Sequence, residues 1–302
     1  LNLQAAGLAR EVAASYDRPR FVIGSVGPGT KLITLGHVDY ATLLASYRLQ
    51  MEGLLEGGVD AILIETCQDL GQIKVAARAA REAMAAKKKR VPLWVQATVE
   101  TTGTLLVGSD IQTVLTSLEP LGLDVLGLNC ATGPDEMHAH LQVLREASPF
   151  RLSCLPNAGL PENVGGQVVY PLDPAGFAPK VLHAASEFGV SILGGCCGTT
   201  PAHIRALAPG VERLNAPVRA PKFTRAAASL YQSGSPRPSS WASAPTPTAR
   251  KNSATCWPPR TGTAWWPWPR SSSGRAPTCW TSAWPTWAAT RSGTWRPTSA
   301  AW

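Results

Sequence analysis

The sequence predicts an α/β fold, a (β/α)8 TIM barrel that is incomplete at its N-terminus. Short apolar or β-branched runs alternate with amphipathic stretches every 30 to 40 residues, as in successive βα units with a parallel sheet. Three of the apolar runs end next to a polar or reactive side chain, at Glu65, Cys130 and Cys196, and the carboxyl ends of strands carry the chemistry in such folds. The sequence has no G-x-G-x-x-G motif that opens a helix, which argues against a dinucleotide-binding sheet.

The elements follow one another in regular order. Residues 1–15 predict a helix with no strand before it. Six apolar or β-branched runs predict strands at Phe21–Val26, Ala61–Glu65, Leu93–Val99, Val125–Asn129, Leu152–Pro156 and Ser191–Gly195. Amphipathic stretches predict helices near residues 39–57, 70–87, 110–119, 134–147, 174–188 and 201–208. Only six βα units are visible and a barrel needs eight, so we expect the first two strands to be encoded upstream of Leu1.

Composition divides the chain into two regions. Residues 1–230 are predicted to form the barrel domain, and residues 231–302 a low-complexity tail of Trp, Pro, Arg and Ser for which no fold is expected. Residues 233–302 contain no Leu, Ile, Val, Met or Phe, the side chains that fill a core. Their composition is typical of GC-rich coding DNA translated out of frame, so the tail is left out of the fold prediction.

The charge distribution excludes several function classes. Residues 1–232 contain equal numbers of basic and acidic side chains, so the net charge of +8 lies in the tail. A nucleic-acid partner is therefore not expected for the barrel. No apolar stretch is long enough to span a membrane and no signal peptide is visible, so we expect a cytoplasmic protein with no membrane partner.

The seven cysteines differ in their surroundings. Cys67 and Cys154 lie in apolar runs and are expected to be buried, and two others lie in the tail. The remaining three each follow a predicted strand in a glycine-rich context: Cys130, Cys196 and Cys197. Three thiolates can hold Zn²⁺ and leave a fourth position open, as in catalytic zinc sites. A redox pair at the two adjacent cysteines remains an alternative, although C-x-x-C spacing is absent.

A zinc site with three thiolates has a net charge of −1 and is electron-rich, so it suits a fourth sulfur ligand. Only about 3% of an alkyl thiol is ionised at pH 7. A thiol bound to zinc is deprotonated outright. This pattern therefore predicts attack by a substrate thiolate on an alkyl donor.

Three motifs of this sequence resemble those of a known family. They are Gly-Leu-Asn-Cys at 127–130, Pro-Asn-Ala-Gly-Leu-Pro at 156–161 and Gly-Gly-Cys-Cys-Gly-Thr-Thr-Pro at 194–201. Together they resemble the homocysteine S-methyltransferase family over residues 1–230. Within it they are most similar to the N-terminal homocysteine-binding domain of the cobalamin-dependent methionine synthases.

The resemblance implies a barrel whose zinc is held by Cys130, Cys196 and Cys197 and binds the homocysteine sulfur. It also implies that Glu65 holds the substrate amino group, which is reasonable for a carboxylate opposite an ammonium. Asn129 and Asn157 are further candidates for substrate binding, since either amide can orient the substrate or the thiolates by hydrogen bonds.

The resemblance also implies cofactors and partners beyond zinc. In the parent enzyme a separate module presents methylcobalamin, and methyltetrahydrofolate supplies its methyl group, so the sites for both lie outside this chain. An alternative within the family is direct use of S-methylmethionine or betaine. Alternatives of another class are a non-catalytic zinc protein or a nucleic-acid-binding protein that uses the Trp- and Arg-rich tail.

The chain departs from the family at its start. The Asp-Gly-Ala-Met-Gly-Thr-like segment of the family's first strand is absent from this sequence. A barrel without two strands has open edges, so we expect this polypeptide by itself to fold poorly or to be inactive.

Overall fold

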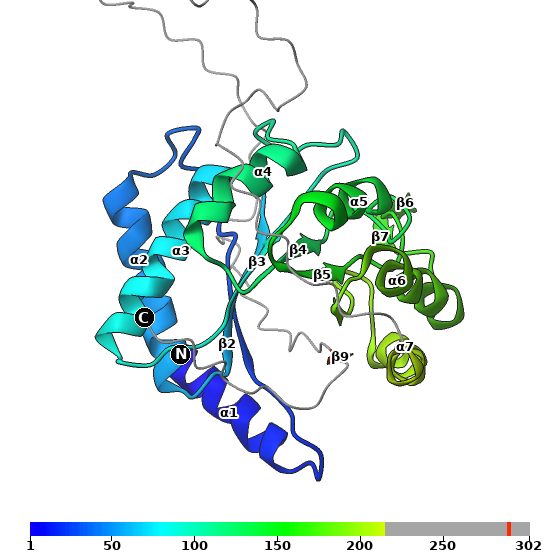
Figure 1. Cartoon of the computed structure of the whole chain (residues 1–302), viewed down its shortest axis with the longest axis horizontal. Helices are drawn as coiled ribbons and strands as arrows, with labels where there is room; N and C mark the ends of the chain where they lie inside the picture. Colours follow the sequence, from blue (N-terminus) through cyan, green and yellow to red (C-terminus); the bar gives the residue numbers. More distant parts are fainter. Residues whose placement is uncertain (215–288, 291–302) are drawn as a thin grey trace, which may run out of the picture. The chain divides into compact units, whose positions relative to one another are not determined.

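The computed structural model describes residues 1–214 and 289–290. Six parallel strands form one curled sheet in which neighbours in the sequence are neighbours in space (Figure 1). These strands are β1 (Ile23–Val26), β2 (Ala61–Cys67), β3 (Leu93–Ala97), β4 (Val125–Asn129), β5 (Arg151–Leu155) and β8 (Ile192–Leu193). The short strand β9 (Ala289–Thr290) pairs antiparallel with β8. This order is that of a TIM barrel with six of its eight units, as predicted.

A helix precedes the first strand, and helices lie between successive strands of the six-stranded sheet and after β8. They are α1 (Asn2–Ala14), α2 (Tyr40–Glu56), α3 (Leu70–Ala86), α4 (Ile111–Leu118), the 3-10 turn η1 (Glu119–Leu121), α5 (His138–Ala147), α6 (Pro174–Phe188) and α7 (Pro201–Arg213). Four of them begin at an aspartate whose carboxylate accepts a hydrogen bond from a backbone N–H two or three residues later: Asp39, Asp69, Asp110 and Asp173. Such caps satisfy donors that a helix start leaves free.

The strands bury side chains on both faces. On the outer face, residues such as Ile62 and Ile64 pack in the main core together with the inward sides of the helices. Alternate residues form a smaller apolar cluster inside the curl, which contains Leu63, Trp94 and Ile192. Side chains alternate between the faces of a strand, so the inward series of β2 that begins at Ala61 and Leu63 reaches Glu65 near the strand's end.

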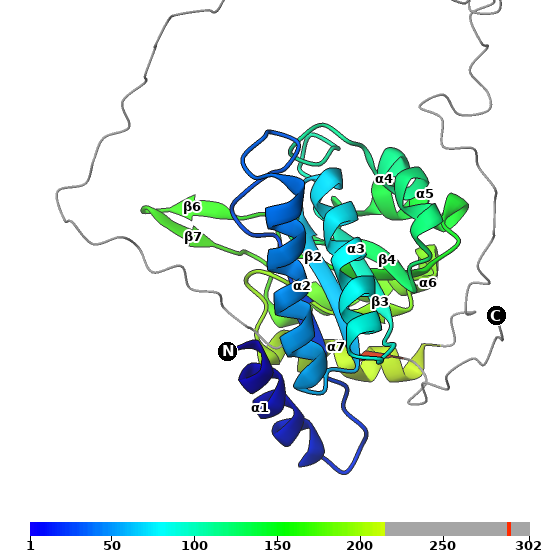
Figure 2. The same ribbon diagram turned by 90° about the vertical axis from the view of Figure 1, so that its left-hand side faces the viewer.

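The structure adds elements that the sequence pattern did not predict. A two-stranded hairpin of β6 (Glu162–Val164) and β7 (Gln167–Val169) projects from the sheet (Figure 2). Its turn residues Gly165 and Gly166 both have positive φ, the backbone of a tight hairpin turn. The hairpin is exposed on both faces, so it lacks the apolar alternation by which strands are recognised.

Element boundaries differ from the predictions by a few residues. Helix α5 begins at His138, because the residues from 134 to 137 form turns. Helix α7 continues through Pro209 to Arg213, so it is longer than predicted. The boundary predicted at residue 230 and the tail beyond it lie outside the described residues, apart from β9. Within the described ranges, none of the helices is long and apolar enough to cross a membrane.

Candidate metal and substrate site

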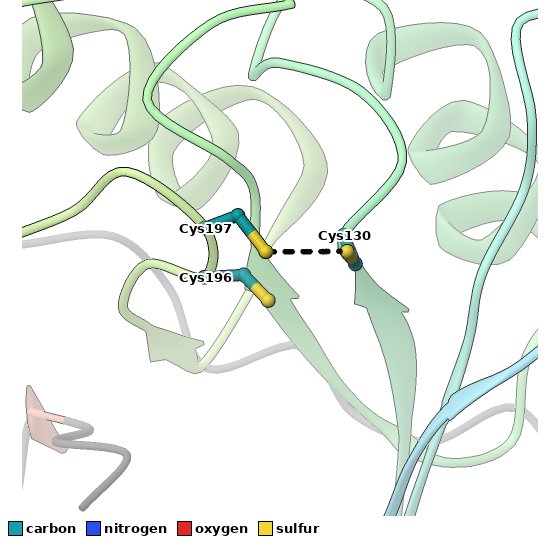
Figure 3. Close-up of side chains that lie close together, drawn as sticks. All are labelled: Cys130, Cys196 and Cys197. Carbon is teal, nitrogen blue, oxygen red and sulfur yellow. Dashed lines mark hydrogen bonds between the residues drawn. The ribbon is translucent and has the colours of Figure 1, made fainter. Parts of the chain in front are cut away.

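Three cysteines converge where β4 and β8 end. Cys130 directly follows β4, and Cys196 and Cys197 lie in the turn between β8 and α7. Their sulfur atoms all lie within 4.8 Å of one another, and the Sγ atoms of Cys130 and Cys197 are 3.7 Å apart (Figure 3). Zn–S bonds of about 2.3 Å in a tetrahedral site place two sulfurs roughly 3.8 Å apart. The donor set therefore fits Zn²⁺ in both chemistry and spacing.

An unusual backbone presents Cys130. Cys130 and Ala131 both have φ near +60°, as does Thr66 at the end of β2. This left-handed conformation costs a non-glycine residue on the order of 1–3 kcal/mol and persists where the surroundings enforce it. Here the N–H of Thr132 donates to the Cys130 carbonyl at 2.7 Å. These three positions lie at the edge of the sheet where the cysteines gather, and such conformations are concentrated at functional sites.

The segment after β5 holds the two adjacent cysteines. The Cys196 N–H donates to the Pro156 carbonyl at 2.8 Å, and the Ala158 N–H donates to the Cys197 carbonyl at 2.9 Å. The Asn157 side-chain oxygen accepts the Cys197 N–H at 3.0 Å. Gly198 has a φ of +77°, which glycine adopts without strain. The cysteine turn is thus fixed by the Pro-Asn-Ala motif.

The three thiols share their protons unequally. Hydrogen bonds from the thiols of Cys130 and Cys196 lower the pKa of Cys197 far below the usual cysteine value. The hydrogen bond with Cys130 raises the pKa of Cys196. By contrast, Cys154 is fully buried, and burial raises its pKa to about 12.

Glu65 and Asn129 lie beside the cysteines. The Ser25 hydroxyl donates to the Glu65 carboxylate at 2.5 Å, and burial raises the pKa of that carboxyl. Asn129 is fully buried. Its Nδ2 donates to the Thr66 hydroxyl at 2.8 Å and lies 3.5 Å from Glu65 Oε2 and 3.7 Å from the Cys196 Sγ. Asn129 thus links the acidic side of the site to the sulfur side.

All six residues singled out in the sequence lie at this edge of the sheet, but Asn157 differs from the others in role. Its side-chain oxygen already binds the backbone of the cysteine turn. Sequence reasoning missed Ser25, which contacts Glu65, and Tyr170, whose ring lies against the backbone at Gly198. Ser25 is the second-last residue of the strand predicted at Phe21–Val26, so its position near a strand end was the available signal. Tyr170 follows the unpredicted hairpin and had no comparable signal.

Comparison with known proteins identifies close relatives. The model of the family described as homocysteine S-methyltransferase matches residues 1–211. The chain is 48% identical over 234 residues to methionine synthase of Mycobacterium tuberculosis, covering 76% of this chain and 20% of that protein. It is 49% identical over 211 residues to methionine synthase of Mycobacterium leprae, covering 69% of this chain and 18% of that protein. The chain therefore spans about a fifth of the length of these relatives.

Among solved structures, the apo form of the homocysteine methyltransferase MmuM from Escherichia coli aligns with 28% sequence identity and a TM-score of 0.48. The alignment covers 68% of this chain and 67% of that one. The metallated form of the same protein aligns with the same identity and TM-score, and the alignment covers 68% of this chain and 65% of that one.

Proposed function

Because the chain belongs to the homocysteine S-methyltransferase family, we propose that residues 1–230 form a zinc-dependent domain that activates homocysteine for methylation to methionine. One observation carries the proposal: the sulfurs of Cys130, Cys196 and Cys197 lie within 4.8 Å of one another, next to a partly buried carboxylate at Glu65. Three soft donors and one acid match a substrate that has a thiol and an ammonium group.

The three cysteines would hold the zinc ion. When bound, zinc would keep the homocysteine thiol ionised at neutral pH, which otherwise costs about 2 kcal/mol. The cysteine turn is held on both sides by backbone hydrogen bonds, so the protein positions its donors before metal arrives. Because metal binding requires reduced thiols, we also propose that the protein works in the reducing cytoplasm.

Glu65 would bind the substrate ammonium group. Its described partners, Ser25 and Asn129, are neutral hydrogen-bond donors, so its negative charge lacks a cation in this arrangement. Burial of that charge is unfavourable until an opposite charge arrives. An ammonium beside Glu65 would neutralise the carboxylate and direct the substrate thiol towards the cysteines. Asn129, which contacts both Glu65 and Cys196, would hold these two side chains in place relative to each other.

We propose methylcobalamin as the methyl donor, presented by a separate module and recharged from methyltetrahydrofolate, because the relatives at 48–49% identity are methionine synthases. The reaction forms a bond between the homocysteine sulfur and the methyl carbon, breaks the bond between that carbon and its donor, and releases the thiol proton to solvent. Direct transfer from S-methylmethionine or betaine is the second candidate. Methionine formation from homocysteine with each donor separately distinguishes them.

The test is metal and homocysteine binding by the full chain, because binding at the cysteines and Glu65 does not require turnover, which we do not expect of this polypeptide by itself. We expect one zinc per chain and homocysteine binding only in the zinc-loaded form. Cys130→Ser should abolish both. Glu65→Gln should retain zinc and weaken homocysteine binding by at least about 30-fold, because loss of one partner of a buried charge pair costs about 2–5 kcal/mol. Glu162→Gln, on the exposed hairpin, is the matched control and should behave as the parent.

Two outcomes would contradict the proposal. Zinc binding without homocysteine binding would favour a non-catalytic zinc protein. Homocysteine binding that survives Cys130→Ser would show that the sulfur does not bind at the cysteine cluster.

A further inference from the structure

A buried histidine in the first turn of α7 connects that helix to the segment before α6. The side chain is that of His203. Its Nδ1 accepts a hydrogen bond from the Thr200 N–H at 3.1 Å, and its Nε2 lies 3.0 Å from the Leu172 carbonyl oxygen. A carbonyl oxygen can only accept, so Nε2 carries the proton of the neutral ring and donates to Leu172.

The imidazole ring of His203 is also fixed by packing. Helices α6 and α7 lie side by side (Figure 1). The fully buried ring of Phe177 in α6 meets the imidazole edge-on, with ring centroids 5.3 Å apart and an angle of 86° between the planes. Packing sets the direction of the ring, and both of its nitrogens are engaged with backbone groups. The histidine is therefore a rigid bridge between two backbone segments.

The backbone contacts that begin at Leu172 lead to a cysteine of the cluster. The Leu172 N–H donates to the Ala158 carbonyl, and the Ala158 N–H donates to the Cys197 carbonyl, both at 2.9 Å. Thr200, whose N–H binds His203, follows Cys197 by three residues. These hydrogen bonds and the backbone from 197 to 203 form a closed ring. The ring joins the segments after β5, before α6 and after β8, and His203 supplies its side-chain link.

The same ring is connected to the other side of the cluster. Asn157 precedes Ala158, and its N–H donates to the carbonyl of Thr132 at 3.0 Å. Thr132 in turn donates its N–H to the Cys130 carbonyl. The ring thus helps to set where Cys197 lies relative to Cys130. Donors that are held in place before a metal arrives lose less conformational freedom when it binds, so they bind it more tightly.

We propose that His203 is a positioning residue for the zinc site, which closes this ring and so holds the backbone of Cys197 where its sulfur can reach the metal. This inference rests on the proposed zinc-dependent function. Hydrogen-bond partners that orient metal ligands typically change metal affinity by about 10- to 100-fold when they are removed. His203 acts on Cys197 through two backbone segments, so we expect an effect at the lower end of that range.

The experiment compares two amides at this position in the full chain, with Cys256→Ser and Cys279→Ser so that the tail thiols bind no metal. His203→Asn places an oxygen where Nδ1 was, so it keeps an acceptor for the Thr200 N–H but is too short to reach Leu172. His203→Gln is one methylene longer and can again donate to the Leu172 carbonyl. Val211→Ala, which removes buried side-chain atoms from α7 away from the ring, is the control for lost packing.

Two properties are measured. Zinc affinity is determined by competition with a chromophoric chelator, and amide hydrogen exchange is followed in the metal-free protein. We expect His203→Asn to weaken zinc binding by about tenfold, and His203→Gln and Val211→Ala to stay within about twofold of the parent. In metal-free His203→Asn, the amides of Ala158 and Leu172 should lose protection while that of Thr200 keeps it, because the ring opens on the Leu172 side.

Each other result has a distinct meaning. Zinc affinity of His203→Asn within twofold of the parent would overturn the inference. If His203→Gln or Val211→Ala weakens zinc binding as much as His203→Asn does, the effect is one of packing and the inference also fails. Unchanged protection of Ala158 and Leu172 would show that His203 does not support the ring. Failure of the parent chain to bind zinc would overturn the proposed function, and the inference with it.

Discussion

Replacing Asn129 by alanine should destabilise the fold as well as the site. The side chain is fully buried and connects the ends of β2 and β4. Its Nδ2 donates to the Thr66 hydroxyl at 2.8 Å, and its Oδ1 accepts the Thr66 N–H at 2.9 Å. Thr66 has a left-handed backbone with φ of +58°, so this pair of hydrogen bonds helps to hold a conformation that the residue does not favour.

The magnitude follows from these contacts. Two well-formed hydrogen bonds contribute about 1 kcal/mol each, and a buried group left without a partner costs about 1–3 kcal/mol. Allowing for partial rehydration of Thr66, which is half-buried, we expect Asn129→Ala to lower the free energy of unfolding by about 2–4 kcal/mol. With a denaturant slope of about 2 kcal/mol/M, the urea midpoint should fall by roughly 1–2 M.

The assay is equilibrium urea unfolding, followed by far-ultraviolet circular dichroism. Asn163→Ala is the matched control, because its side chain makes one hydrogen bond, to the Gly166 N–H, in the exposed hairpin. It should change stability by less than about 1 kcal/mol. A loss below about 1 kcal/mol for Asn129→Ala would refute the reasoning, since the Thr66 conformation would then be held by other contacts.

Three further predictions follow from the same geometry. Asn157→Ala should weaken zinc binding about 10- to 100-fold in chelator competition, because it removes the acceptor for the Cys197 N–H. Unchanged zinc affinity would contradict this prediction and would show that the backbone hydrogen bonds alone hold the cysteine turn. Phe177→Ala should cost about 3–5 kcal/mol in urea unfolding, because this ring is fully buried in the main core; a cost under about 1 kcal/mol would mean that the core collapses around the gap. Burial raises the pKa of Glu65, so the folded protein keeps that proton to a higher pH than the unfolded chain. The free energy of unfolding should therefore decline as the pH rises above about 4.3. Glu65→Gln should lessen that decline in unfolding measured across pH, and an identical pH dependence in both proteins would contradict the assigned cause.

Most of the fold was predictable because βα units have a strong local pattern. Strand β4 and helix α6 begin and end at the predicted residues. The helix that starts at Tyr40 was predictable within a residue, because Asp39 is a recognisable cap. The exposed β6–β7 hairpin was not predictable, because its stability depends on a tight Gly-Gly turn and not on a buried face.

The cysteine site was predictable only in part. The residues were identifiable because Cys130, Cys196 and Cys197 stand at strand ends in glycine-rich motifs, and parallel strands end at one edge of a sheet. The role of Asn129 as a link between Glu65 and Cys196 could not be predicted, since the three lie on β4, β2 and the turn after β8. Their proximity depends on how the sheet curls.

By itself, the sequence determined which strands and helices of the βα units form and which edge of the sheet carries reactive side chains. Both properties follow from local periodicity, capping and chain direction. Tertiary structure alone decided that the sulfurs of Cys130 and Cys197 lie 3.7 Å apart, that Ser25 contacts Glu65, and that the ring of Tyr170 packs on the backbone at Gly198. These contacts join residues 28 to 67 positions apart. Distances of that kind are set by sheet curvature and by the packing of loops, which no local pattern encodes.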